Sequence, residues 1–344
     1  MTQDSGPDAT KPPESDPTPP TALICIPHFF RRDSAGAEPT PGIGQSALME
    51  TRDSLRQDDA AARRQRRIAC VEACLFQLRT LFEAHGRWAA RHQDKTLAAM
   101  PNPFALSLDI CLVTDGENHL IEDLPLPEGF FRQVIVDDPP EHLGYACHRL
   151  LAEALEGPEP IPDWFVYMED DLIIQDPLFF HKIALFNRAA EASLAEGALS
   201  RPPVLQPHRW EDPLGAPAER KQAFLRSYPD YELTPDPVYQ GPVLALDFLG
   251  HSFRMEPSRD PHAGCFFLNQ AQMAHIAQEP TFWDPSQMWT TPLDSAATLA
   301  VARAFTVYKP MLDSTAFLEL RHGAPLMLWE IQAGATGEPP RWEF

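Results

Sequence analysis

Four largely apolar runs in the first half of the chain constrain its fold more than any other feature. They are ALICIPHFF (residues 22–30), LSLDICLVTDG (residues 106–116), FRQVIVDDPP (residues 131–140) and FVYMEDDLIIQD (residues 165–176). Their apolar residues are consecutive rather than alternating, and this pattern is typical of strands buried on both faces of a largely parallel sheet. Helical segments separate some of these runs, so we predict an α/β fold with a mostly parallel sheet and helices on both faces.

Apolar residues with helical spacing predict several helices. The predicted helical segments contain Ile68 to Phe82, LGYACHRLLAEALEG (residues 143–157), the stretch after Asp176 with Asp176 as its cap and Pro177 at its first position, and PLDSAATLAVARAF (residues 292–305). The basic run RRQRR (Arg63–Arg67) precedes Ile68, and Asp58 and Asp59 lie about one turn earlier. We interpret this run as a solvated helix face rather than an anion site.

The composition predicts how the chain is divided. Residues 1–20 are polar and rich in proline, so we expect a disordered tail. Residues 21–180 contain the predicted sheet, and residues 181–344 are less regular. Long ordered loops are expected over residues 200–262, except where the apolar segment PVYQGPVLALDFLG (residues 237–250) interrupts them. We find neither a signal peptide nor an apolar stretch of membrane-spanning length, and the cysteines form no zinc-site spacing, so we expect a cytoplasmic protein.

The charge balance narrows the class of partner. The chain has 28 Lys and Arg against 49 Asp and Glu, which gives a formal net charge of −21. Nucleic acids and anionic membranes attract basic surfaces, so neither is expected as a partner. A small anionic substrate remains possible, because a bound divalent ion can reverse the local field.

Carboxylates gather where the predicted strands end. Asp115, then Asp137 and Asp138, and finally Glu169 to Asp171 follow three of the four apolar runs. Ligands of open α/β sheets bind outside the carboxyl ends of the strands. Adjacent residues of a strand point to opposite faces, so we expect Glu169 and Asp171 on one side and Asp170 on the other. Two carboxylates suit a Mg²⁺ or Mn²⁺ ion whose remaining ligands are substrate phosphates and water.

The segment WFVYMEDDLII (residues 164–174) resembles the metal-binding DxD-type motif of GT-A glycosyltransferases. LICIPHFF (residues 23–30) and CLVTDG (residues 111–116) look like the first two nucleotide-binding strands of that family, and LGYACHRLLAEAL (residues 143–155) like the helix before its metal strand. The similarity of arrangement covers about residues 22–180 and implies a Rossmann-like GT-A fold. It also implies that residues 21–180 form the nucleotide-donor-binding half and residues 181–344 the acceptor-binding half of one catalytic domain.

The resemblance also implies roles for the carboxylates. Asp171 would bind the divalent ion, and Glu169 would contact the donor ribose or support the ion through water. Asp115 would lie near the nucleoside, and we place Asp170 with the donor-binding residues as well. The first acid of the motif is Glu rather than Asp, which leaves open whether Glu169 reaches ribose or metal.

Two later residues complete the expected site. Asp294 stands at the start of a predicted helix, at a place in the chain comparable to that of the catalytic base of inverting GT-A enzymes. An acid at this position could equally complement the helix dipole. Asp247 and Glu256 are weaker candidates for the base. His322 resembles the late histidine that completes the metal shell in some of these enzymes and would favour manganese. Further candidates for diphosphate or acceptor contacts are Lys309, Arg321, Arg254, Trp283, Trp289 and Phe282.

The expected function is therefore transfer of a sugar from a nucleotide-sugar donor, such as a UDP- or GDP-sugar, to a hydroxyl of a glycan or other acceptor. A Mg²⁺-dependent nucleotidyltransferase is an alternative, although CIPHFFRRDSAG (residues 25–36) lacks the glycine-rich phosphate loop usual in that class. A non-catalytic carbohydrate- or protein-binding module on the same fold is a third possibility. A haloacid-dehalogenase-like phosphatase is disfavoured because no Thr closely follows EDDLIIQ (residues 169–175).

Overall fold

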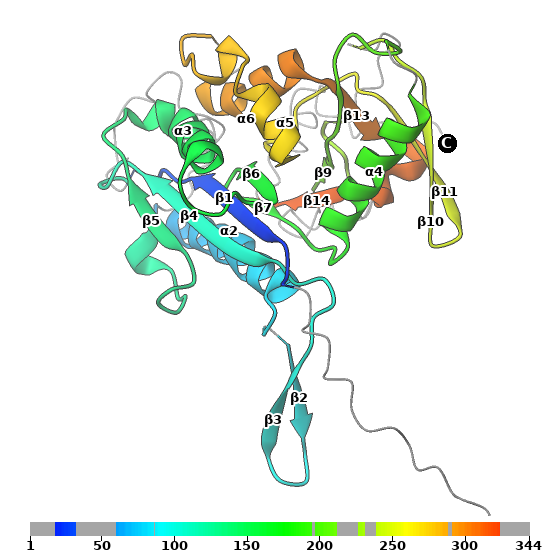
Figure 1. Ribbon diagram of the computed structural model, residues 1–344. Coiled ribbons are helices and arrows are strands. Elements are labelled where there is room, and N and C mark those ends of the chain that lie inside the picture. The colour runs from blue at the N-terminus through cyan, green and yellow to red at the C-terminus, as the bar shows by residue number, and fades with distance from the viewer. Residues whose placement is uncertain are drawn as a thin grey trace, which may run out of the picture.

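The computed structural model describes residues 18–31, 60–85, 87–194, 197–211, 226–230, 239–287 and 291–323. A five-stranded sheet lies at the centre of the molecule (Figure 1). Its strands are β1 (Thr21–Pro27), β4 (Ser107–Thr114), β5 (Arg132–Ile135), β6 (Trp164–Met168) and β12 (Cys265–Asn269), in the order β5-β4-β1-β6-β12. The first four run parallel, and β12 runs antiparallel to β6. The predicted α/β fold with a mostly parallel sheet is confirmed.

Helices cover both faces of this sheet. The helices α2 (Ala60–Phe82) and α4 (Phe179–Ser193) contribute to one apolar cluster, and α3 (Leu143–Glu156), α5 (Gln270–Ile276) and α6 (Pro292–Ala304) contribute to the other. Successive residues of β1 belong to alternate clusters: Ile24 packs with α2 and α4, whereas Leu23 and Cys25 pack with α3. Since both faces of the strand are buried, an uninterrupted apolar run is what its environment requires.

Three smaller sheets surround the central one. One has the order β10 (Leu244–Phe248), β11 (His251–Pro257), β13 (Thr306–Pro310) and β8 (Pro203–Leu205); another has the order β7 (Leu172–Ile173), β14 (Glu319–His322) and β9 (His208–Trp210). The prediction of long loops over residues 200–262 was therefore wrong where β8, β9 and β11 form, whereas β10 lies in the apolar segment 237–250 that was set apart from those loops. Strands β8 and β9 have only three residues each, and β11 is largely exposed over its first four residues, so none of the three gives a long apolar run.

The third small sheet is a hairpin that was not predicted. Its strands β2 (Arg87–Arg91) and β3 (Thr96–Met100) pair antiparallel and project away from the body of the molecule (Figure 1). Short 3₁₀ helices cover Ile121–Asp123, Pro140–His142, Pro280–Phe282 and Leu312–Phe317. No helix of the described residues is long and apolar enough to cross a membrane.

A few sequence expectations differ at their ends or fall outside the described ranges. The helix α4 begins at Phe179, later than predicted, because the Asp176 carboxylate accepts a hydrogen bond from the Leu178 N–H in the turn before the helix. Residues 1–17 of the predicted tail, Gly86 and Trp289 lie outside the described residues.

Candidate functional site

Three consecutive carboxyl side chains follow β6, and all three are buried. Glu169, Asp170 and Asp171 lie beyond the carboxyl end of the strand, beside the point where the order of the sheet reverses between β1 and β6. Buried carboxylates without partners would destabilise the fold, since an uncompensated buried charge costs several kcal/mol or more. The contacts of each carboxylate therefore reveal what the site is built to hold.

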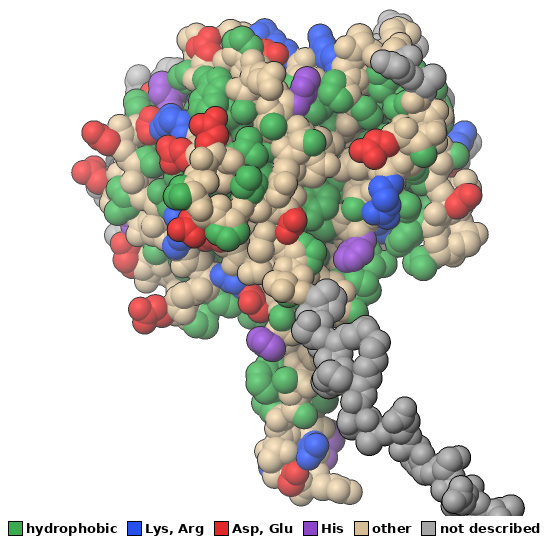
Figure 2. Space-filling view, viewed as in Figure 1, with side chains coloured by type: hydrophobic (Ala, Val, Ile, Leu, Met, Phe, Trp, Pro, Cys, Tyr) green, Lys and Arg blue, Asp and Glu red, His purple; other side chains and the backbone are tan. Residues whose placement is uncertain are grey.

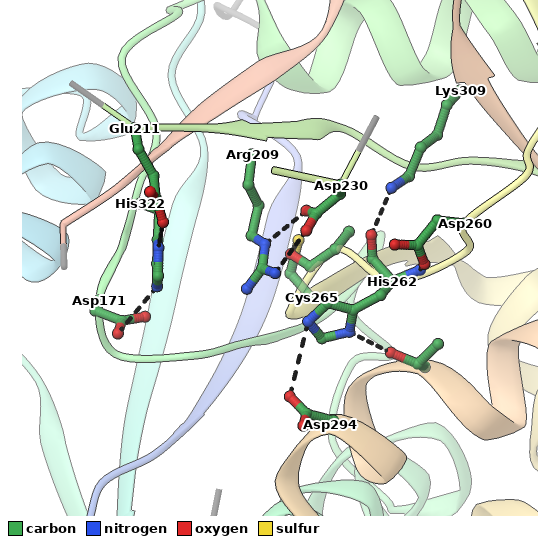
Figure 3. A network of polar contacts seen from close by, with 12 residues as sticks. Asp171, Arg209, Glu211, Asp230, Asp260, His262, Cys265, Asp294, Lys309 and His322 are labelled. Carbon is green, nitrogen blue, oxygen red and sulfur yellow. Dashed lines mark hydrogen bonds and ion pairs between the residues drawn. The ribbon is translucent and has the colours of Figure 1, made fainter. Parts of the chain in front are cut away.

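A second strand brings a histidine to Asp171. Strand β14 pairs antiparallel with β7, which places His322 opposite Leu172, and the Gly323 N–H donates to the Asp171 carbonyl at 2.7 Å. As a result the His322 Nε2 lies 3.4 Å from Asp171 Oδ2, and its Nδ1 lies 2.8 Å from Glu211 Oε1 (Figure 3). The two predicted metal ligands are thus adjacent, and Glu211 holds the far side of the imidazole.

The charged groups around Asp171 and His322 shift each other's pKa values strongly. Burial alone would lower the pKa of His322, but the carboxylates of Asp171 and Glu211 raise it to about 9. Burial alone would raise the pKa of Asp171, but His322 and Arg67 outweigh it and hold that pKa well below its usual range. Without a bound cation, His322 is therefore protonated and Asp171 ionised at neutral pH.

The carboxylate of Asp170 is fully engaged within the protein. Glu169 to Asp171 lie in the turn between β6 and β7, so the strand alternation that predicted opposite sides for these carboxylates does not apply. His28 Nδ1 lies 2.5 Å from Asp170 Oδ2, and Arg67 pairs with Oδ1. The Leu120 N–H donates to His28 Nε2 at 3.0 Å, so Nδ1 carries the ring proton and donates it to Asp170. Arg67 also reaches Asp171 Oδ2 at 3.2 Å and so joins the two carboxylates.

The Arg67 contacts correct one sequence interpretation. The run Arg63–Arg67 was expected to form a solvated face, and Arg64 and Arg66 are exposed. Only 10 % of the Arg67 side chain is exposed, because it lies one turn before Val71 on the buried stripe of α2. That register, an arginine four residues before a core position, is the signal that could have identified it.

A buried arginine occupies the middle of the network. Arg209 in β9 donates two parallel hydrogen bonds to Asp230, from Nε at 2.6 Å and from Nη2 at 2.7 Å (Figure 3). Burial opposes ionisation of both groups, yet each charge outweighs it: the pKa of Arg209 is raised and that of Asp230 is lowered. The positive charge of Arg209 also acts on Glu169 and Asp171. No sequence pattern indicated this residue, since β9 is a three-residue strand.

Glu169 is the least compensated acid of the group. Burial, followed by the charges of Asp171 and Asp294, raises the pKa of Glu169 well above its usual range. Its backbone N–H donates to the Gly264 carbonyl at 3.0 Å. Gly264 has φ +63°, and a Cβ on it would lie 2.9 Å from Glu169 Oε2. Only glycine thus leaves room for this carboxyl group.

Asp294 lies in the first turn of α6, as predicted, and faces a histidine. The Thr291 hydroxyl caps the helix and donates to Asp294 Oδ2 at 2.7 Å. On the other side, the Nε2 atom of His262 is 3.7 Å from Asp294 Oδ1 (Figure 3). Burial raises the pKa of Asp294. Burial, assisted by the nearby positive charge of Arg209, lowers the pKa of His262 to about 3, so this imidazole is neutral.

Several other candidates have their own partners. Both oxygens of Asp115 accept hydrogen bonds within its turn, from the N–H groups of Glu117 and Asn118 and from the Asn118 amide, so Asp115 stands apart from the network. Lys309 is buried and donates to the His262 carbonyl. Arg254 pairs with Asp313 at the surface.

The fit of a divalent ion can be judged from atoms without partners. Within the described part of the chain, seven buried side-chain atoms of the site have no hydrogen-bond partner: Arg67 Nε, Glu169 Oε1, Asp171 Oδ1, Arg209 Nη1, His262 Nε2, Asp294 Oδ1 and His322 Nε2. In the same ranges, no group of three or more His, Cys, Asp or Glu side chains is arranged to hold a metal ion. Two protein donors fit an ion whose other ligands are phosphates and water, as Mg²⁺ often binds.

No protein-family model matches the chain, and no curated protein matches its sequence. The chemistry of the site is therefore inferred from its own residues.

Proposed function

We propose that this protein is a metal-dependent glycosyltransferase that moves a sugar from a UDP- or GDP-sugar donor to the hydroxyl group of a glycan or related acceptor. One observation carries the proposal: Asp171 and His322, far apart in the sequence, lie 3.4 Å apart, and each retains a buried atom without a hydrogen-bond partner. Neighbouring ligands of an octahedral ion with bonds of about 2.1 Å are about 3 Å apart, so both could bind one Mg²⁺ or Mn²⁺ ion.

The order of the strands supports a nucleotide at this edge. Read by their order in the chain, the parallel strands of the central sheet lie in the order third, second, first, fourth. Doubly wound nucleotide-binding sheets have this order and bind their ligand where it reverses, between the first and fourth strands. Glu169 and Asp171 follow the fourth of these strands, and His28 follows the first. A GT-A fold is our interpretation of this arrangement.

The residues would divide the work as follows. A bound divalent ion would act as a Lewis acid toward the leaving diphosphate. Asp171 and His322 would hold that ion, with His322 giving up its proton to do so. Arg67, anchored on Asp170, fixes the orientation of Asp171 from behind. Glu169 would face the donor ribose. Asp115 and Asp170 were predicted to bind the donor; both oxygens of each have partners within the protein, so their contact with a donor stays a prediction.

Asp294 is the proposed base. Its free Oδ1 would accept the proton of the acceptor hydroxyl as that oxygen attacks the anomeric carbon. Burial raises the pKa of this carboxyl group, which makes its ionised form a stronger proton acceptor than an exposed aspartate. Inversion of the anomeric configuration is the outcome that this role implies.

Thermal stabilisation by nucleotides is the first test. The melting temperature would be measured with UDP, GDP, CDP and their sugar conjugates, each with and without Mn²⁺. We expect one nucleotide to stabilise the protein only with the metal, and Asp171→Ala to abolish that increment. Asp313→Asn, which alters an exposed acid paired with Arg254, is the control. Stabilisation that Asp171→Ala leaves unchanged would contradict the metal assignment.

A second candidate is a non-catalytic binding module on the same fold. The ion pairs within the site favour this candidate. Arg67, Arg209 and His322 already neutralise much of the charge of Asp170, Asp171 and Asp230 without a metal ion. Nucleotide-dependent stabilisation without any hydrolysis or transfer of the conjugated sugar would support this module over an enzyme. The expected cytoplasmic location stays a prediction.

A further inference from the structure

The projecting hairpin exposes large apolar side chains. Strands β2 and β3 extend from the body of the molecule, and Figure 2 shows hydrophobic side chains along this projection. Trp88 is 57 % exposed and Leu97 is 65 % exposed. Burying such side chains contributes about 1.5–3 kcal/mol each, so their position at the surface of a projection indicates that something covers them.

These side chains share one face of the hairpin. The register places Trp88 opposite Ala99 and Ala90 opposite Leu97, so all four point to the same side. The hairpin packs extensively on no other described helix or strand. A lone two-stranded hairpin is marginally stable in water, which makes a covering surface necessary for its stability as well.

The hairpin is basic within an acidic protein. It carries Arg87, Arg91 and Lys95 against one acid, Asp94, whereas the whole chain has a net charge of −21. Its cations therefore favour an acidic partner surface, and other copies of this chain provide one.

A groove at the base of the hairpin has the complementary character. Phe76 and Phe130 stack in it with ring centroids 6.3 Å apart, and Phe76 is 52 % exposed. Arg79 and His85 line the groove together with Glu83 and Glu128. Arg79 lies over Phe130 and pairs with Glu83, so the acidic character of the groove comes from Glu128. Its volume is about 380 Å³, which is enough for one or two large side chains.

We propose that the hairpin is a dimerisation arm that docks into this groove on a second copy of the chain. The contact is reciprocal: two copies related by a two-fold axis each insert an arm beside the arm of the other. Trp88 and Leu97 then cover the exposed Phe76, whereas Arg87 and Arg91, on the opposite face of the hairpin, and Lys95 in its turn face the acidic body of the second copy. A reciprocal contact of this kind closes as a dimer, since each surface is used once.

The size of the arm suits this arrangement. A five-residue strand is about 17 Å long, so an arm lying along its counterpart can bring its apolar face to the base of the other arm. Both arms and both grooves are buried together, which doubles the area that a single arm could bury and brings it toward that of a stable interface.

The oligomeric state of the full chain tests the proposal. Mass would be measured by sedimentation equilibrium between 1 and about 100 µM, at low and high salt. We expect a dimer that dissociates at least tenfold more readily after Trp88→Ser with Leu97→Ser, and after Phe76→Ser alone. Val243→Ser, an exposed apolar residue elsewhere, is the matched control and should leave the dimer intact.

A charge-reversal pair adds a positive test. Arg87→Glu with Arg91→Glu should weaken the dimer at low salt, and high salt should remove that difference, because both arginines face the acidic body of the second copy. Circular dichroism would verify that each variant is folded. A wild-type chain that is monomeric across this range, or a dimer indifferent to the arm and groove variants, would overturn the proposal; binding of the arm to another acidic protein would then be the alternative.

Discussion

The Nε2 atom of His262 lies 3.7 Å from the Oδ1 atom of Asp294, and within the described residues neither atom has a hydrogen-bond partner. This separation is too long for a direct hydrogen bond. The far side of each group is fixed, since His262 Nδ1 lies 2.7 Å from the Thr298 hydroxyl and Thr291 donates to Asp294. A hydroxyl oxygen placed between the two groups would satisfy both, and in the proposed function this oxygen would be the acceptor hydroxyl.

Asp294→Asn should lower turnover by about 10²-fold or more while leaving donor affinity within about twofold, because an amide cannot accept the acceptor proton. Initial rates and calorimetric titration with the stabilising nucleotide and Mn²⁺ would measure the two effects. Asp284→Asn, an exposed acid shortly before α6, is the control. A fully active Asp294→Asn protein would remove Asp294 as the base.

Arg67→Met should destabilise the protein by about 3–5 kcal/mol, because it leaves Asp170 and Asp171 without their shared cation. The free energy of unfolding in urea is the measurement. Adding Asp170→Asn should recover part of the loss. Arg64→Met removes an ion pair with Asp123 at the surface and should cost about 1 kcal/mol or less. Equal losses at the two arginines would refute a special role for Arg67.

The sequence predicted the main elements of the fold better than the residues around the candidate site. Central strands and long helices were predictable because burial on both faces requires continuous apolar runs, as in β1 and β6. The carboxylates after β6 and Asp294 were proposed because they follow or begin such elements, whereas His322 was proposed only from the family resemblance. Their companions Arg209, Glu211 and His262 lie in or beside short strands, where no periodicity marks them.

The hairpin was missed for a related physical reason. Its sequence, RWAARHQDKTLAAM (residues 87–100), combines alanines and charges that do not favour strands in isolation. The position of His322 was equally hard to predict. Only the pairing of β14 with β7 brings His322 to Asp171, and no local sequence pattern encodes that register.

Gly264→Ala should destabilise the protein more than Gly250→Ala. Both glycines have positive φ, +63° and +79°, so each substitution introduces backbone strain of about 1 kcal/mol. At Gly264 the new methyl group also meets the Glu169 carboxyl group at 2.9 Å, whereas nothing lies within 4 Å at Gly250. We expect an additional loss of about 1–3 kcal/mol in urea unfolding, and Glu169→Ala should relieve it. Identical losses at both glycines would contradict a tight contact with Glu169.

The stability of the protein should depend on His148 between pH 6.5 and about 4. His148 is fully buried in the core and stacks on Phe282, and burial lowers its pKa to about 4. An unfolded histidine has a pKa of about 6.5, so below that pH the unfolded chain binds a proton that the folded protein excludes. Stability is therefore lost as pH falls, by about 1.4 kcal/mol per pH unit.

Comparison with His148→Gln isolates this contribution from the other titrating groups. Glutamine can still donate to one of the carbonyls that His148 contacts, those of Phe282 and Ala296, but it does not titrate. The difference in unfolding free energy between wild type and variant should shift by about 2 kcal/mol in favour of the variant from pH 7 to pH 5. A difference that stays constant with pH would mean that the folded protein accepts the proton on His148, with both ring nitrogens donating to the two carbonyls.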